Sequence, residues 1–346
     1  MTAFIARRTL WMFLVLFVVS IVTFFLMRAV PGGPFDSERD FPDSVIENLE
    51  ARFGLDDPLI IQYFRYISAI VIPTVTESGP PTLTAEVYLV NVDLPGGEQT
   101  LRWMNFGPSL VFRSRSVTDI FRENLGVTFE LGLAGILVAV VIGLPAGITS
   151  ALNRNTVWDY LGMSIATIGV SVTVITLGPL MQYIFGVELR LLPISGWGDG
   201  LDITNPWEHI QFMIMPAFAL GFAQSAIIAR LTRASLLQVL NEDYIRTARA
   251  KGLSSQRVIW SHVLKNGMIP VVTVLGPIAA FLVTGSFVTE QIFAIPGIGR
   301  AYVQSIGNRD YTLIMGTTLF FAFILVIANT LVDISYAWLD PRIRYD

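Results

Sequence analysis

The sequence predicts an all-α integral membrane protein with six transmembrane helices. The chain of 346 residues is 53% hydrophobic and only 14% charged, whereas soluble domains carry about 25% charged residues. Its apolar residues are concentrated in six runs that contain no Asp, Glu, Lys or Arg: residues 9–27, 131–153, 160–187, 210–229, 266–289 and 311–332. Each run can form one crossing, because about 20 helical residues span the hydrocarbon core of a bilayer.

The first run is expected to remain in the protein as a transmembrane helix. Arg7 and Arg8 precede it, as positive residues precede the apolar part of a signal peptide, but no small-residue cleavage site follows Met27. We therefore assign residues 1–30 to an N-terminal tail and the first helix.

Residues 31–126 are expected to form an external domain between the first two crossings. Residues 43–53 and 58–70 are compatible with two short helices. Residues 86–92 have the composition of a strand, and residues 95–97 (Pro-Gly-Gly) predict a turn after it. The chain contains no Cys, so disulfides and thiolate metal sites are excluded.

Residues 127–346 are expected to form a five-helix core. The second crossing is rich in small residues, which let transmembrane helices approach one another closely. The alternative is that Gly and Pro are simply more frequent in membrane helices than in soluble ones. The residues concerned are Gly132, Gly135, Gly143, Pro145 and Gly147.

The distribution of Lys and Arg predicts the orientation of the chain. With six crossings both termini lie on one side, and the segments on that side hold 12 Lys and Arg residues, seven of them between Arg230 and Lys265. The two short loops on the other side hold three. Because short cytoplasmic loops carry the excess of positive charge, we expect both termini to be cytoplasmic.

The internal loop at residues 230–265 carries the clearest functional signal, because its pattern is that of two short helices. Asn241 is the expected N-cap of the first helix, and Gly252 is the expected C′ residue after its end. Ser254 or Ser255 is the expected cap of the second helix. A basic loop needs no partner, since insertion alone favours positive charge inside. A short capped helix can nevertheless dock in a groove of a partner protein.

Part of this loop has a familiar pattern. Residues 247–252 (Thr-Ala-Arg-Ala-Lys-Gly), followed by Ile269 and Pro270, resemble the cytoplasmic EAA-type loop of permeases from binding-protein-dependent ABC importers. Residues 246–248 (Arg-Thr-Ala) stand where the family's name has Glu-Ala-Ala. The resemblance implies that this loop contains a coupling helix that contacts an ATPase subunit, formed by Tyr244, Ile245, Arg246, Thr247, Ala248, Arg249, Ala250, Lys251, Gly252 and Leu253.

Other segments resemble the B-type subunit of oligopeptide and dipeptide permeases. They are residues 28–35, 52–58, 295–299, 308–311 and 340–345, which together run nearly end to end. The resemblance implies the permease fold of type I ABC importers and a location in a bacterial inner membrane. The main departure from the family's pattern is a probable insertion at residues 72–101.

The resemblance also implies a function and a set of partners. The chain would be the permease subunit of an ABC importer for oligopeptides or dipeptides, with another solute such as a nickel chelate left open. It would work with a second, homologous permease subunit, two ATPase subunits on the cytoplasmic side and an extracytoplasmic peptide-binding protein. A gate or binding-protein contact is expected on the external side at Pro296, Gly297, Ile298 and Gly299, although a plain connecting turn fits these residues equally well.

No catalytic role or cofactor is expected in this chain. It has no G-x-x-x-x-G-K-[ST] loop to bind nucleotide phosphates, so ATP and Mg are assigned to the ATPase subunits. His209 and His262 are expected on opposite sides of the membrane, each in an interfacial polar role, and so cannot share a metal ion.

Three acidic residues, Glu130, Glu290 and Asp333, adjoin the apolar runs. Acidic residues within a membrane are functional candidates, but all three lie at the ends of runs, where we expect water or headgroups to reach them. A proton relay is therefore not favoured.

Two other classes of protein are possible on the sequence alone. An ion-coupled secondary transporter would show acidic residues at mid-depth and inverted repeats with broken helices, and neither is evident. A membrane-anchored binding module would act through residues 31–120, but six helices would be an excessive anchor for it.

Overall fold

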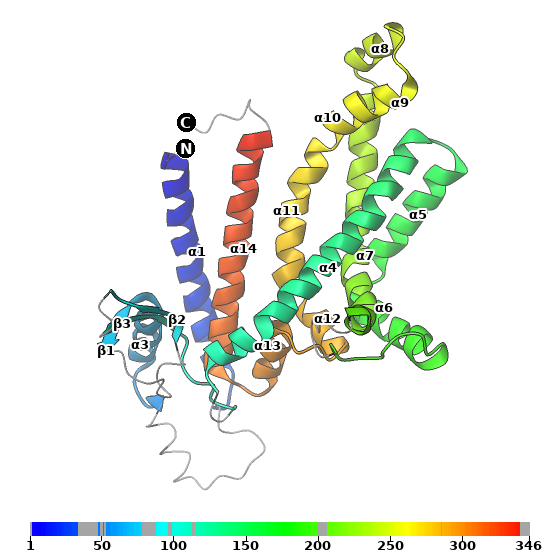
Figure 1. The fold of residues 1–346 in the computed structure, drawn as a ribbon. Coiled ribbons are helices and arrows are strands. Elements are labelled where there is room, and N and C mark those ends of the chain that lie inside the picture. Colours follow the sequence, from blue (N-terminus) through cyan, green and yellow to red (C-terminus); the bar gives the residue numbers. More distant parts are fainter. Residues whose placement is uncertain are drawn as a thin grey trace. The chain divides into compact units, whose positions relative to one another are not determined.

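Figure 1 shows the fold as a computed structural model, which describes residues 2–33, 48, 51, 53–77, 88–95, 99–112, 115–198, 206–284 and 286–339. The chain divides into two compact units. The core unit comprises residues 127–300 with 1–8 and 324–346, and the N-terminal unit comprises residues 9–126 with 301–323.

Among the described residues, five helical stretches are long and apolar enough to cross a membrane, which confirms five of the six predicted crossings. They lie in α1 (Thr2–Ala29), α4 (Val117–Leu152), α7 (Pro206–Leu240), α11 (Ile269–Thr284) with α12 (Phe287–Ile292), and α14 (Tyr311–Leu339). A shorter helix, α13 (Ile298–Gly307), precedes α14.

The predicted crossing at residues 160–187 is formed by a bent pair of helices instead of one continuous helix. The structure has α5 (Val157–Ser171), then α6 (Val174–Met181) and the π-helix η1 (Gln182–Glu188), with a bend of 101° after α5. Val172 and Thr173, at the bend, both have extended backbone angles. Both are β-branched, and β-branched side chains favour extended over helical backbone. The sixth crossing therefore exists only if the bent pair counts as one span.

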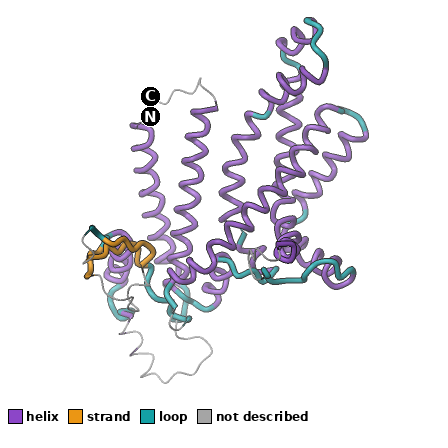
Figure 2. The backbone as a smooth tube through the Cα atoms, in the orientation of Figure 1, coloured by secondary structure: helices purple, strands orange, loops and turns teal. Residues whose placement is uncertain are grey.

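Helix packing forms the interior of the core unit. Helix α7 packs against α5, α6 and α11, and Figure 2 shows α4, α5, α7 and α11 as neighbouring helices of this unit. Their shared interior is apolar and fully enclosed, as close-packed side chains require. It includes Leu131, Met215, Ile228, Leu282 and Phe293.

The glycines of α4 lie where this helix meets α7 and α11. A Cβ on Gly143 would come within 2.6 Å of the backbone oxygen of Ser225, and one on Gly147 would come equally close to the backbone oxygen of Ala229. A Cβ on Gly132 would meet Val283 of α11. Real Cβ atoms do not approach so closely, so the interpretation of these glycines as close-packing residues is confirmed.

The N-terminal unit combines α1 with α3 (Leu59–Val71) and a three-stranded antiparallel sheet. The sheet contains β1 (Thr74–Glu77), β2 (Tyr88–Asp93) and β3 (Gln99–Asn105) in the order β1-β3-β2. The predicted helix at 58–70 and strand at 86–92 are confirmed within two residues. Most of the predicted helix at 43–53, and residues 96–97 of the predicted turn, lie outside the described residues.

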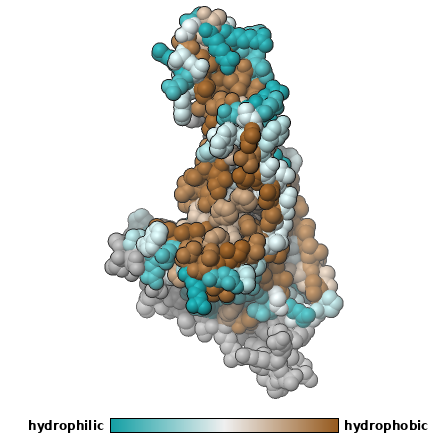
Figure 3. Space-filling model, turned by 90° about the vertical axis from the view of Figure 1, so that its right-hand side faces the viewer, coloured by the Kyte–Doolittle hydropathy of each residue, from teal (hydrophilic) through white to brown (hydrophobic). Residues whose placement is uncertain are grey.

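The surface of the core unit suits a lipid environment. On the face seen in Figure 3, a hydrophobic band separates hydrophilic residues at the two ends of this unit. Helix α5 is one example, because it exposes large apolar side chains along its length, among them Val157, Trp158, Leu161, Ile165 and Ile168. An exposed apolar surface of this extent marks contact with lipid or with another protein.

Candidate functional site

The helical segment after α7 begins with α8 (Asp243–Ala250), which starts after Glu242 and ends before Gly252. The N-cap is Glu242, which has an extended backbone, so the prediction of Asn241 is wrong by one residue. The Asn241 side chain instead donates to the carbonyl of Leu237 and serves the end of α7. Gly252 is confirmed as the C′ residue, because it follows the C-cap with φ +76°, a conformation that glycine adopts without strain.

The next helices return the chain to the end of α7. Ser254 is confirmed as the N-cap of α9 (Ser255–Val258), which continues into the π-helix η2 (Ile259–Leu264) and α10 (Lys265–Gly267). The Ser235 hydroxyl of α7 donates to the Gly267 carbonyl over 2.7 Å. A Cβ on Gly267 would lie 2.5 Å from the Leu236 side chain. These contacts hold α10 directly on α7.

Helix α8 is anchored to its own chain by one face. Ile245 is fully enclosed and Ala248 is nearly so, and they pack with Ala151 from the end of α4 and Leu236 from α7. Ala248 is therefore turned toward its own chain, and Ala250 is the small residue left at the surface. The Asn266 side chain also donates to the Tyr244 hydroxyl over 3.0 Å.

The other face of α8 is open and basic. Its exposed residues include Arg246, Thr247, Arg249, Ala250 and Lys251. Asp243 lies 3.5 Å from Arg246, but both side chains are highly exposed, and exposed pairs of this kind contribute little to stability. The helix thus presents positive charge around a small residue while its apolar face is held in place. Such a surface can bind an acidic, concave partner.

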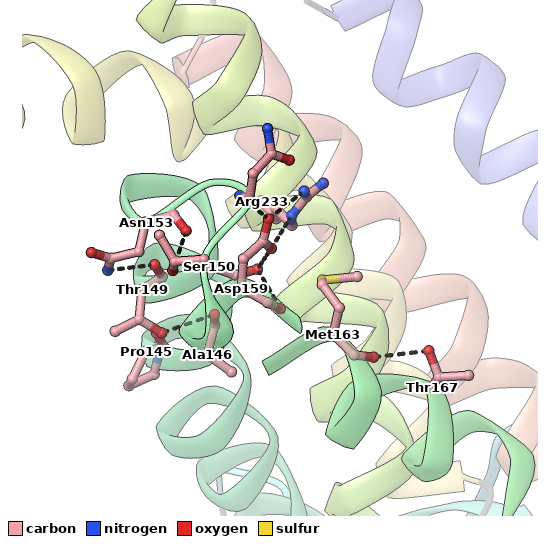
Figure 4. Close-up of polar contacts among 11 residues, drawn as sticks. Pro145, Ala146, Thr149, Ser150, Asn153, Asp159, Met163, Thr167 and Arg233 are labelled. Carbon is pink, nitrogen blue, oxygen red and sulfur yellow. Dashed lines mark hydrogen bonds and ion pairs between the residues drawn. The ribbon is translucent and has the colours of Figure 1, made fainter. Parts of the chain in front are cut away.

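A partly buried ion pair fastens the α4–α5 connection to α7 beside this segment (Figure 4). The Arg233 guanidinium donates from Nε and from a terminal nitrogen to both oxygens of Asp159, over 2.7 and 2.8 Å. Asp159 also accepts from the Ser150 hydroxyl and from the Asn155 backbone amide. The bidentate geometry and the extra donors are what a buried carboxylate requires.

At the opposite end of α7, His209 is buried in a polar contact. One of its ring nitrogens lies 2.8 Å from a carboxylate oxygen of Glu130 in α4, and the other lies 3.0 Å from the Trp197 carbonyl. His262 lies in η2, which packs at the far end of α7. Among the described residues, no group of three or more His, Cys, Asp or Glu could hold a metal ion.

The expectation that water reaches Glu290 is wrong, because this residue has no exposed surface. Its carboxylate accepts from the hydroxyls of Thr128 and Ser286 and from the Arg300 backbone amide. Glu130 is about a quarter exposed, and the side chain of Asp333 lies outside the described residues.

The predicted external turn is largely enclosed. Pro296 is exposed, whereas Gly297, Ile298 and Gly299 are buried. The structure therefore leaves one of these four residues at the surface and places Gly297 and Gly299 against Glu290.

Asp159 and Arg233 were not distinguished by the sequence. Arg233 is one of seven basic residues in its loop, and Asp159 directly precedes an apolar run, where a solvated loop residue is the simpler expectation. Their pairing joins residues 74 positions apart. The only local signal is the position of Asp159 in the first turn of α5, where acidic residues are favoured by the helix dipole.

Two families of membrane transport components match the sequence. The family described as binding-protein-dependent transport system inner membrane component matches residues 143–345, and the N-terminal family of such membrane components matches residues 1–82.

The named relatives are similar over their whole length. The chain is 42% identical to the dipeptide transport system permease protein DppB of Bacillus subtilis strain 168, over 99% of this chain and 98% of the relative. It is 37% identical to the oligopeptide transport system permease protein OppB of Salmonella typhimurium strain LT2, over the full length of both.

A solved structure shares the fold at low identity. A chain of the MetNI methionine ABC transporter, in an inward-facing conformation, has a TM-score of 0.52 and 17% identity to this chain, covering 64% of this chain and 96% of that one.

Proposed function

Because the chain belongs to the family of binding-protein-dependent transport system inner membrane components, we propose that it is the permease subunit of an ATP-driven importer for dipeptides or oligopeptides. The observation that carries this proposal is full-length similarity to relatives named as dipeptide and oligopeptide permeases. The chain is a multi-pass protein of the inner membrane and is itself a non-catalytic transport subunit. An ion-coupled secondary transporter is not favoured.

The proposed assembly contains four other chains: one in the membrane, two in the cytoplasm and one outside the cell membrane. A second, homologous permease subunit encloses the pathway with this one, and two ATPase subunits lie on the cytoplasmic side. An extracytoplasmic binding protein delivers the peptide. ATP and Mg are bound by the ATPase subunits, and this chain needs no cofactor. Both of its termini are cytoplasmic, an orientation supported by the excess of Lys and Arg in the loops on that side.

The coupling contact is the open face of α8, within the segment from Tyr244 to Leu253. Its support is geometric: the face is basic and exposed, while Ile245 and Ala248 fasten the helix to α4 and α7. A load on this face is therefore passed to two packed helices, because close-packed interiors transmit displacement. The Asp159–Arg233 pair adds α5 to the same rigid group.

The external turn at residues 296–299 serves as part of a gate or as a contact for the binding protein. Exposure at Pro296 alone limits any direct contact to that residue. The buried remainder acts by holding the turn in place.

Co-purification and transport test the proposal. The tagged chain, extracted in detergent, should carry a second permease and an ATPase pair with it, and the assembly in liposomes should import peptide only with ATP and the binding protein. A chain that moves peptide alone under an ion gradient would refute the proposal. If the assembly imports nickel chelates and not peptides, the ATP-driven mechanism stands but the proposed substrate is wrong.

A further inference from the structure

The segment from Glu290 to Arg300 is built around a buried carboxylate. Glu290 has no exposed surface, and a carboxylate removed from water must be satisfied by hydrogen-bond donors. The Ser286 hydroxyl donates to Oε1 over 2.6 Å, and the Arg300 backbone amide donates to Oε2 over 2.9 Å. The carboxylate thus spans from α12 to the first residues of α13.

Thr128 of α4 supplies the remaining donor and links this cluster to another helix. The Thr128 hydroxyl accepts the backbone N–H of Ile298 over 2.9 Å. Its own proton is therefore directed to Glu290 Oε1, 3.0 Å away. One hydroxyl group, itself only 1% exposed, joins α4 to the carboxylate and to the turn.

The two glycines of the turn are explained by the same carboxylate. A Cβ on Gly297 would overlap the carboxylate group of Glu290. A Cβ on Gly299 would lie 2.5 Å from the Phe287 Cα and 2.9 Å from Glu290 Oε2. The two glycines of the Pro-Gly-Ile-Gly sequence therefore leave the space that the Glu290 carboxylate occupies, in addition to allowing a bend.

We propose that Glu290 is a positioning residue of the transport cycle, which makes the turn at residues 295–300 follow the movement of α4. This inference rests on the proposed function, because it assumes that α4 and α7 move when the ATPase subunits bind ATP. The carboxylate and the Thr128 hydroxyl form the connection. They are the groups through which a displacement of α4 reaches the backbone of Ile298 and Arg300.

The test uses the assembled importer with spin labels at two single cysteines, since the chain has none of its own. Gln256→Cys reports on α9 beside the coupling helix, and Pro296→Cys reports on the turn; both positions are exposed. Import is measured in unlabelled variants, and each labelled importer must still recruit its ATPase subunits before its spectrum is recorded. A non-hydrolysable ATP analogue should change the spectrum of both labels in the parent chain.

Thr128→Val removes the connecting hydroxyl and keeps the shape of the side chain. It should preserve the response at position 256, abolish the response at position 296, and lower peptide imported per ATP hydrolysed about tenfold, the scale of one lost hydrogen bond to a charged group. Glu290→Gln should behave in the same way. Thr128→Ser, which keeps the hydroxyl, should restore both readouts.

Thr317→Val is the matched control, because Thr317 is equally buried but its hydroxyl bonds only to carbonyls of its own helix. This variant should leave both labels and the import ratio unchanged. The inference is overturned if Thr128→Val keeps the response at 296 and the import ratio, or if position 296 never responds in the parent. Absence of any response at 256, in a chain that recruits no ATPase, would overturn the proposed function itself.

Discussion

Three carboxylates of the core unit have hydrogen-bond or ion-pair partners on a neighbouring helix. Asp159 pairs with Arg233, Glu130 with His209, and Glu290 with the hydroxyls of Thr128 and Ser286. In a low-dielectric interior an unpaired polar group is costly. Each cluster therefore specifies one arrangement of its helices, which apolar packing alone specifies less strictly.

The Asp159–Arg233 pair provides a residue-scale prediction. Arg233→Ala leaves the enclosed Asp159 carboxylate without its charged partner and should destabilise the protein by about 1–3 kcal/mol. The measurement is the midpoint of thermal unfolding in detergent. Arg246→Ala is the matched control, because Arg246 and its partner Asp243 are both highly exposed. An unchanged midpoint in Arg233→Ala would show that the pair contributes nothing to stability.

Glycine positions on α4 provide a second residue-scale contrast. Gly147→Leu should prevent the close approach of α4 to α7 and lower both the yield of folded protein and its thermal midpoint. Gly126→Ala should be tolerated, because nothing lies within 4 Å of a Cβ at that position and alanine favours the helix by about 1 kcal/mol. The check is size-exclusion chromatography in detergent. Equal behaviour of the two variants would contradict the packing role of Gly147.

At the scale of elements, one face of α8 packs against its own chain and the other is open to a partner. The apolar face is enclosed by the ends of α4 and α7, and the basic face is open. An eight-residue helix is marginal by itself in water, so its stability comes from this docking. The open face can then engage a partner without reorganising the helix.

Paired variants of α8 separate the roles of the two faces. Arg249→Glu, on the open face, should weaken association with the ATPase subunits while leaving the thermal midpoint of the isolated chain unchanged. Ile245→Ala, on the enclosed face, should lower the thermal midpoint as well, because truncation of a buried isoleucine costs about 2–5 kcal/mol. Pull-down of the ATPase subunits and detergent unfolding measure the two effects. Normal association of Arg249→Glu would remove this face from the proposed contact.

At the scale of the whole molecule, the ordering of apolar and charged segments determines a membrane topology. The described helices supply five crossings and a bent pair that can supply the sixth. An even number of crossings and the excess of Lys and Arg in alternate loops place both termini in the cytoplasm under the proposed orientation.

Cysteine accessibility measures this orientation directly. Arg154→Cys, in the exposed connection between α4 and α5, should resist a membrane-impermeant maleimide in intact spheroplasts and react in inverted vesicles. Glu208→Cys, at the start of α7, should show the opposite pattern. The cysteine-free parent gives the background. Reversed labelling of the two positions would invert the proposed topology.

The sequence alone was sufficient to predict the membrane class and five crossings. It also predicted that α8 ends before Gly252 and that α9 starts after Ser254. These features are local, because they depend on runs of apolar residues and on caps that lie within a few positions of one another. Resemblance of short motifs also led to the family.

Only the tertiary structure decided which side chains of each helix are buried and which partners they pair with. The inward orientation of Ala248 and the burial of Glu290 depend on what packs against these residues. The pairing of Asp159 with Arg233, and of Thr128 with Glu290, joins positions far apart in the chain. Such contacts leave no periodic signal in the sequence, because they are created by the packing of helices and not by any one helix.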